Sequence, residues 1–312
     1  MKKFLALIIA IMAFMLASAT VFAGEIILNE DFSSAGLSDW SVTTADRGSI
    51  VSEAGTLSLK ANGSSGIQQA RRTIGSITDN SVFEFRVKLE ASVENKGLTV
   101  ALYNGVTRAF MRIYANKFMI NTTVNPLTVM EAHEEGVWYT YYLVITNSGK
   151  TADIYRRTDG QSDMLNIASG VALQANTGTR IDVFIESSED MAARVDYIRY
   201  YTDGLHIMEK SFSSGGAPIT SIPNGELTAE CNITHSGDGN ETATVILIVF
   251  DAEGMIRAMD VQRREFTGFS NEAVKVTVDL SEFYQNVKNG SAELYVWDSV
   301  EGMQPLCTLS SI

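Results

Sequence analysis

Apolar and polar residues alternate along most of the chain beyond the first 24 residues, with the two-residue period of β-strands. In VFEFRVKLE (82–90) every second residue from Phe83 onward is apolar, and GLTVALYNG (97–105) repeats the alternation. The segment WYTYYLVITNSGKTADIYRR (138–157) predicts two strands joined by a hairpin at 147–150. No helical period continues over three turns in this region. The pattern therefore predicts an all-β chain.

The spacing of the predicted strands indicates two domains. Gly, Asn, Asp and Ser stand at the joints between strands in residues 24–203, which predicts an antiparallel β-sandwich of the jelly-roll type. The pattern pauses at TDGLH (202–206) and then resumes with another series of short strands. These predict an immunoglobulin-like β-sandwich for residues 204–312. Within it, VILIVF (245–250) is expected to be a central strand buried on both sides.

The first 23 residues have the pattern of a secretory signal peptide. A basic start, MKK, precedes the apolar run FLALIIAIMAFML, and small residues lead up to Ala23. We expect cleavage between Ala23 and Gly24, with a cut after Ala19 as the alternative. The apolar run is shorter than the roughly 20 residues of a membrane span. The sequence therefore predicts a secreted, extracellular protein that does not remain in the membrane after cleavage.

The composition excludes some partners. The formal net charge is −13, and it becomes −15 once Lys2 and Lys3 leave with the signal peptide. Nucleic acids and anionic membranes need basic surface, so neither is expected as a partner. Cys231 and Cys307 are either joined by a disulfide, which export permits, or two buried thiols. The sequence leaves the oligomeric state open.

Each predicted domain resembles a known family of secreted modules. NEDFSSAGLSDW (29–40), GVWYTYYLVITNSGKTADIY (136–155) and VDYIRYY (195–201) resemble concanavalin-A-like jelly rolls, which serve as carbohydrate-binding modules and as related glycanases. AELYVWDSVEGMQPLC (292–307), with LIVFDAEGMI and VTVDL before it, resembles a fibronectin- or immunoglobulin-like C-terminal module of secreted proteins from clostridia-like bacteria. The first resemblance implies a polysaccharide as the partner.

The same resemblance implies a structural calcium ion. Such jelly rolls often hold one between an acidic residue near the N-terminal strand and an Asp on the last strand, and Glu30 or Asp31 and Asp196 match those places. Calcium takes six or more oxygen ligands, of which these side chains supply only part. The alternative is that they are ordinary acidic residues at strand ends.

The segment TRAFMRIYAN (107–116) is apolar on both faces of its predicted strand. Met111 and its alternate neighbours suit a core, yet Phe110 and Tyr114 fall on the opposite face among arginines. Grouped aromatic residues on an outer face are typical of an interaction site, although a covering loop or the second domain would also explain them. By strand parity we predict a carbohydrate-binding face made of Glu84, Arg86, Tyr103, Phe110, Arg112 and Tyr114.

The sequence offers little for catalysis. Jelly-roll glycanases supply paired carboxylates with an E-x-D-x-x-E-like spacing, which is missing here, and Glu131, Glu134 and Glu135 fall in a predicted loop. The favoured hypothesis is a non-catalytic polysaccharide-binding protein, whose arginines suggest an acidic plant glycan such as pectin. The alternatives are a lyase or glycoside hydrolase acting on such a glycan, and a structural cell-surface spacer. Trp138 and Trp297 are expected to be buried, and Trp40 to close one end of the sandwich.

Overall fold

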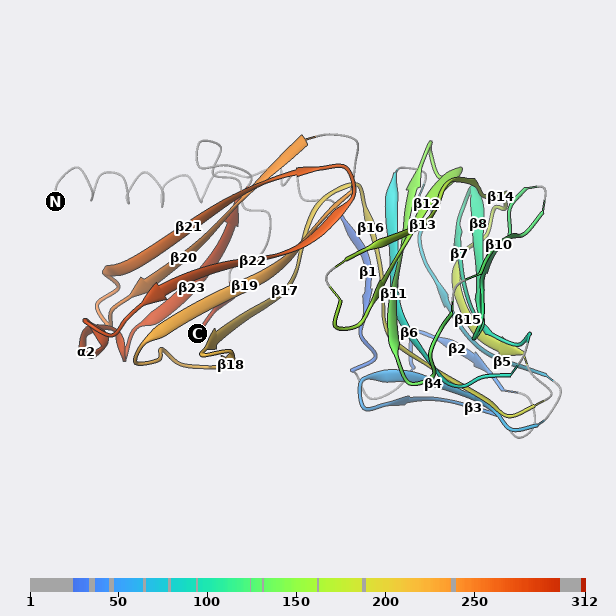
Figure 1. Ribbon diagram of the computed structural model, residues 1–312, viewed down its shortest axis with the longest axis horizontal. Coiled ribbons are helices and arrows are strands. Elements are labelled where there is room, and N and C mark those ends of the chain that lie inside the picture. Colours follow the sequence, from blue (N-terminus) through green and yellow to red (C-terminus); the bar gives the residue numbers. More distant parts are fainter. Residues whose placement is uncertain are drawn as a thin grey trace. The chain divides into compact units, whose positions relative to one another are not determined.

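The computed structural model describes residues 25–33, 37–44, 48–63, 66–77, 80–93, 95–123, 125–130, 132–161, 163–186, 189–236, 240–297 and 310–312. The predicted signal peptide (1–23), Glu131 and Cys307 lie outside these residues. The chain forms two compact units, Glu25–Asp203 and Gly204–Ile312, and each is built from strands (Figure 1).

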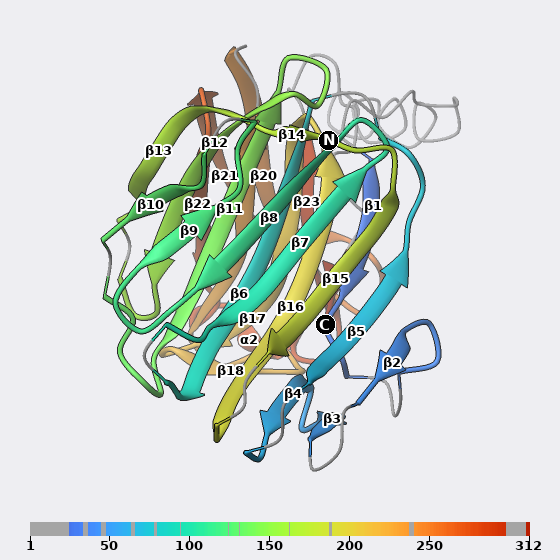
Figure 2. The ribbon, with the colours of Figure 1, turned by 90° about the vertical axis from the view of Figure 1, so that its right-hand side faces the viewer.

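The N-terminal unit consists of two antiparallel sheets around one apolar core, so the predicted all-β fold is confirmed. In the described residues the β6 sheet has the order β13-β12-β11-β6-β16-β4-β3, with β1 beside β16. The β7 sheet has the order β10-β9-β8-β7-β15-β5-β2, with β14 beside β8; Figure 2 shows its long strands side by side. The bounds are β1 Ile26–Glu30, β2 Ser41–Thr43, β3 Ser49–Glu53, β4 Thr56–Ala61, β5 Ile67–Thr73, β6 Ser81–Ala91, β7 Leu98–Asn104, β8 Thr107–Ile113, β9 Phe118–Ile120, β10 Leu127–Val129, β11 Trp138–Thr146, β12 Thr151–Thr158, β13 Leu165–Ala172, β14 Gln174–Ala175, β15 Thr179–Glu186 and β16 Met191–Thr202.

Aromatic rings join the two sheets through the core. Phe85 of β6 and Tyr141 of β11 stack with ring centroids 5.4 Å apart, and Tyr141 stacks on Phe118 of β9 at 5.3 Å. Because β9 belongs to the opposite sheet, this three-ring stack spans the sandwich. All three rings are fully buried, which is the burial that the alternating pattern predicts for inward positions.

The predicted hairpin at 147–150 connects β11 and β12. Asn147, Ser148 and Gly149 all have positive φ, at 54°, 53° and 81°. Asn and Gly tolerate this left-handed region better than most residues, so the NSG sequence suits the turn. The prediction is confirmed.

The C-terminal unit also consists of two antiparallel sheets that share one core, in which Cys231 is buried. Within the described residues their orders are β18-β17-β19-β22 and β21-β20-β23-β24. Here the bounds are β17 Gly204–Ser214, β18 Ala217–Pro218, β19 Glu226–Ser236, β20 Asn240–Phe250, β21 Ile256–Thr267, β22 Ser270–Asp279, α2 Tyr284–Val287, β23 Ser291–Trp297 and β24 Ser310–Ser311. As predicted for VILIVF, β20 lies between two other strands, but it is buried on both faces only in part: Ile246 is buried on the outer face, whereas Ile248 and Phe250 are partly exposed. None of the described helices is long and apolar enough to cross a membrane.

The three tryptophans differ in their surroundings. Trp40 is 6% exposed, packs against Phe32, and donates a hydrogen bond from Nε1 to Glu30 at 3.1 Å, as expected of a residue that closes the sandwich. Trp297 is buried, as predicted. Trp138 is only partly buried, so that prediction is wrong: its ring lies on the outer face of the β6 sheet, with the cations of Arg86 and Lys88 5.0 Å and 4.9 Å from its centroid.

Candidate functional site

The six residues of the predicted carbohydrate-binding face do not lie on one face. Glu84 and Arg86 belong to β6, whereas Tyr103 belongs to β7 and Phe110 and Arg112 to β8 of the opposite sheet. Each of these side chains faces away from the core. The outer faces of the two sheets, however, lie on opposite sides of the sandwich. The predicted grouping is therefore wrong, and the two sets must be considered separately.

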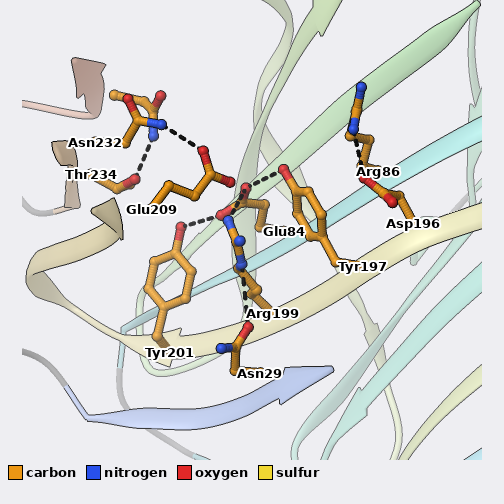
Figure 3. Close-up of polar contacts among 11 residues, drawn as sticks. Asn29, Glu84, Arg86, Asp196, Tyr197, Arg199, Tyr201, Glu209, Asn232 and Thr234 are labelled. Carbon is orange, nitrogen blue, oxygen red and sulfur yellow. Dashed lines mark hydrogen bonds and ion pairs between the residues drawn. The ribbon is translucent and has the colours of Figure 1, made fainter. Parts of the chain in front are cut away.

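Glu84 is the centre of a hydrogen-bonded network rather than part of an open face (Figure 3). The hydroxyls of Tyr197 and Tyr201 donate to its two carboxylate oxygens at 2.7 Å and 3.0 Å, and Arg199 forms an ion pair with it at 3.5 Å. Arg199 also lies over the Tyr197 ring at 4.1 Å. Burial, followed by the negative charge of Glu84, raises the pKa of Tyr197 well above its usual value. Glu84 is thus bound to its own chain.

A β-bulge in β16 explains how Arg86 is held. The register between β16 and β6 shifts between Val195 and Tyr197, which leaves Asp196 as the extra residue. Arg86 bonds to Asp196 at 2.6 Å (Figure 3). It also forms an ion pair with Asp159 at 3.0 Å. Burial by itself lowers the pKa of Arg86, but its bond to Asp196 and the two carboxylate charges raise it overall.

The carboxylates predicted to hold a calcium ion, Glu30 or Asp31 together with Asp196, are bound by neighbouring side chains instead. Glu30 pairs with Arg72 and accepts a hydrogen bond from Trp40, and Asp196 pairs with Arg86. Asp31 accepts hydrogen bonds from the side chain and the amide of Ser33, which lower its pKa. Among the described residues, no three His, Cys, Asp or Glu side chains are grouped as a metal would require. The predicted ligands do not fit calcium, because two of the carboxylates are already neutralised by arginines.

The outer face of the β7 sheet carries a group of aromatic and basic side chains that includes Tyr103, Phe110 and Arg112 of the predicted positions. In β15 the residues Ile181, Val183 and Ile185 are fully buried, so Arg180 and Phe184 point outward. The register pairs Arg180 with Tyr103, which is paired in turn with Arg108 on the other side of β7. In the same way Phe184 is paired with Thr99, and Thr99 with Arg112. We call this surface the arginine–phenylalanine face and define it by Arg71, Tyr103, Arg108, Phe110, Arg112, Arg180 and Phe184.

Two phenylalanines form the apolar centre of this face. The rings of Phe110 and Phe184 are 5.6 Å apart, centroid to centroid, and inclined by 61°. They come from β8 and β15, which lie on either side of β7, so they meet above the small residues of that strand. Ala101 and Thr99 beneath them are 0% and 3% exposed. Small residues in the middle strand therefore allow both rings to lie low and remain partly exposed.

Three of the four arginines are held by their own neighbours. Arg71 makes a two-pronged ion pair with Asp182, at 2.6 Å and 3.1 Å, and this bond raises the pKa of Arg71. Arg180 also bonds to Asp182, at 3.1 Å, and lies 3.8 Å from the centroid of the Tyr103 ring. Arg108 donates two hydrogen bonds to Gln174, at 2.8 Å and 2.6 Å.

Arg112 has different surroundings. Its guanidinium lies 4.8 Å from the centroid of the Phe110 ring, and among the described residues it makes no ion pair and no side-chain hydrogen bond. It is paired across the strands with Thr99 on one side and Met119 on the other. The N–H groups of Arg112 are thus available to a ligand.

Tyr114 lies just beyond the end of β8, at the margin of the same surface. It is partly exposed, and the ammonium of Lys117 is 4.9 Å from the centroid of its ring. Gly97 makes room for it, because a Cβ at that position would be 3.0 Å from the Tyr114 ring and 2.4 Å from the Ile113 carbonyl oxygen. The placement of this ring therefore depends on the glycine that directly precedes β7.

Sequence reasoning missed Arg71, Arg180, Asp182 and Phe184. The sequence contains a pattern that could have identified three of them, since RIDVFIESS (180–188) alternates in the same way as residues 82–90 and 97–105. Assigning parity to this segment would have placed Arg180, Asp182 and Phe184 outward. Its position beside β7 rests on a strand pairing distant in sequence, which the local pattern does not show.

Within the described parts of the chain, Asp182, Glu186, Glu134 and Glu135 do not form a pair of the kind used in glycoside hydrolysis. Asp182 is almost completely buried and bound by two arginines, and Glu186 follows it at the exposed end of β15. Glu134 and Glu135 are exposed loop residues, and Glu135 accepts hydrogen bonds from Ser92. What the face can do chemically is to stack on an apolar surface and to bind an anion.

Comparison with known proteins gives only remote structural similarities. No protein-family model matches the chain, and no curated protein matches it either. Among solved structures it is similar to a sialidase (14% identity, TM-score 0.41), over 58% of this chain and 19% of that one. It is also similar to a GH43 protein from Bacillus licheniformis (15% identity, TM-score 0.41), over 56% and 39% of the two chains. The peanut lectin in complex with a nine-residue peptide is a third case (11% identity, TM-score 0.44; 57% and 98%). The chain thus spans well under half the length of the first two, and likeness at this level leaves its activity and ligand open.

Proposed function

We propose that the protein is a secreted, non-catalytic carbohydrate-binding protein whose arginine–phenylalanine face binds an acidic polysaccharide, such as the pectin of plants. The observation that carries this proposal is the pair of phenylalanine rings, 5.6 Å apart, on a face that also carries four arginines, in a protein with a formal net charge of −13. In this proposal residues 1–23 are removed on export, and residues 204–312 form an immunoglobulin-like accessory module.

The chemistry of the face suits a sugar chain that carries negative charge. The C–H surface of a pyranose ring packs on aromatic rings, and arginine binds carboxylates through two parallel hydrogen bonds. The face is built on adjacent strands of one sheet, and most of its arginines are already fixed by Asp182 and Gln174. A preorganised surface of this kind loses little conformational entropy when it binds.

The proposal is tested by binding of the whole protein to polygalacturonate, alginate and neutral galactan, measured by isothermal titration calorimetry. We expect binding to the two acidic chains, and Phe184→Ala should weaken it about ten-fold or more because it removes half of the ring pair. The matched control is Tyr155→Ala, which removes an aromatic ring from β12 of the opposite sheet. Equal effects of both substitutions, or no binding to any polysaccharide by the unchanged protein, would contradict the proposal.

A uronate lyase is the second candidate, and one observation favours it. The Tyr103 ring lies under the Arg180 guanidinium at 3.8 Å, and a lyase needs a proton acceptor beside a group that neutralises the uronate carboxylate. The assay is absorbance of unsaturated uronate products after incubation with polygalacturonate or alginate. An increase that Tyr103→Phe abolishes would replace the binding proposal by the lyase.

A further inference from the structure

We propose that Arg112 determines the specificity of the arginine–phenylalanine face and selects chains of uronic acid with free carboxylates. This inference rests on the proposed function, since it takes the face to be the glycan-binding surface. It goes further by naming the residue that recognises the charge and the chemical group that it recognises.

The first step is the difference between Arg112 and the other arginines of the face. Arg71 and Arg180 both bind Asp182, and Arg108 binds Gln174. Arg112, in the part of the chain that the structure describes, has only the face of the Phe110 ring beneath it. A guanidinium has five N–H donors, and those of Arg112 are not used by a carboxylate or an amide of any residue that the structure describes. A bound anion would therefore form hydrogen bonds with Arg112 in preference to the other arginines of the face.

The second step is the position of Arg112 relative to the ring pair. It follows Phe110 by two residues on the same side of β8, and Thr99 separates it from Phe184 across the sheet. The guanidinium thus lies at the rim of the apolar centre, and the contact with Phe110 at 4.8 Å orients it there. A sugar ring stacked on Phe110 and Phe184 would have its substituents beside Arg112.

The third step concerns the amount of charge that the face can accept. Asp182 neutralises part of the positive charge, and Glu186 stands at the end of the same strand. A heavily sulfated chain carries several anionic groups per disaccharide, whereas only one of the four arginines of this face lacks a polar partner among the described residues. A uronate carries one planar carboxylate on each ring, which matches the fork of a single guanidinium. The geometry favours the uronate.

The test compares binding of the whole protein, Arg112→Gln and Arg112→Lys to polygalacturonate, its fully methyl-esterified form and dextran sulfate. We expect the unchanged protein to bind polygalacturonate about ten-fold or more tightly than the ester, because a hydrogen-bonded charge is lost on esterification. Arg112→Gln should bind both forms equally, at the level of the ester. Arg112→Lys should fall between the two, since it keeps the charge and loses the fork.

The control is Arg263→Gln, which removes one positive charge from an exposed position in the C-terminal unit and should leave the preference unchanged. Thermal melting of each variant shows whether it is folded. If Arg112→Gln is not folded, Arg112→Lys takes its place in the test. A preference for polygalacturonate that persists in Arg112→Gln would overturn the inference, as would tighter binding to dextran sulfate than to polygalacturonate; in both cases the face still binds glycans. Failure of the unchanged protein to bind any polysaccharide would overturn the proposed function together with the inference.

Discussion

Met111 and Tyr114 lie three positions apart, yet they belong to opposite environments. Met111 is 0% exposed in the core, and Tyr114 is partly exposed beyond the end of β8. Met111→Ala should lower the free energy of unfolding by about 2–5 kcal/mol, because it leaves a cavity. Tyr114→Ala should lower it by less than about 1 kcal/mol, since few core contacts are lost.

Urea denaturation of the two variants, followed by tryptophan fluorescence, measures this difference. Ile113→Val serves as the control, as a mild change at a second buried position of β8, with an expected loss of about 0.5–1.5 kcal/mol. If Tyr114→Ala destabilised the protein as much as Met111→Ala does, the outer surface at this point would be part of the packed interior.

At the residue scale, the sequence was informative about orientation and uninformative about partners. The parity of β8 predicted that Met111 points inward and Arg112 outward, and the structure confirms both. Glu84 also points outward as expected. Its hydrogen-bond partners Tyr197 and Tyr201 were not foreseen, because they are 113 and 117 positions away in the chain. A local pattern contains no information about such contacts. A predicted ligand-binding carboxylate was therefore found in an internal network.

The turn between β20 and β21 depends on one carboxylate. Asp251 accepts hydrogen bonds from the amides of Glu253 and Met255, at 3.0 Å and 2.8 Å, and pairs with Arg257 at 2.6 Å. The Met255 amide first, and then Arg257, lower the pKa of Asp251 below its ordinary value of 3.8. A carboxyl group with a lowered pKa stabilises the fold above its unfolded pKa, and this contribution is lost as the pH falls through the folded pKa.

We therefore expect Asp251→Asn to lower the melting temperature of the C-terminal unit at pH 7. The difference from the unchanged protein should shrink as the pH falls below 3.8 and through the lowered pKa of Asp251, because its carboxyl group then becomes neutral like the Asn side chain. Thermal melts followed by circular dichroism across this range measure the effect. Glu265→Gln removes a charge from a 75% exposed side chain and should change little at any pH. A constant difference between Asp251→Asn and the unchanged protein at all pH values would be contrary evidence.

At the scale of elements, strands were predictable and their assignment to sheets was not. The alternation gave β6, β7, β8 and the hairpin after β11 from local residues. Yet β6 and β7 follow one another in the chain and belong to opposite sheets, so equal parity put Glu84 and Tyr103 on opposite sides of the sandwich. The bulge in β16 is a second feature that the alternating pattern does not predict. Because of it, the consecutive residues Asp196 and Tyr197 both bond to side chains of β6.

The two units have separate cores, which leads to a prediction for the whole molecule. The apolar core of the N-terminal unit contains Phe85, Tyr141 and Phe118, and that of the C-terminal unit contains Leu227, Val245 and Leu294. Residues 25–203 and residues 204–312 should therefore each fold when produced alone. Cooperative melting of each fragment, and binding of polygalacturonate by residues 25–203 but not by residues 204–312, are the expected results. Binding by the C-terminal fragment alone would move the glycan site to the other unit.

The formation of the arginine–phenylalanine face from alternate residues of β8 and β15 also bears on how such a protein changes over generations. Met111, Ile113 and Val183 maintain the core, while Arg112 and Phe184 beside them contact the surroundings. Mutations at the outward positions can accumulate without disturbing folding, because the inward positions between them stay the same. Ligand specificity can thus change during evolution while the fold is retained. A library randomised at the outward positions of these two strands would test this in the laboratory.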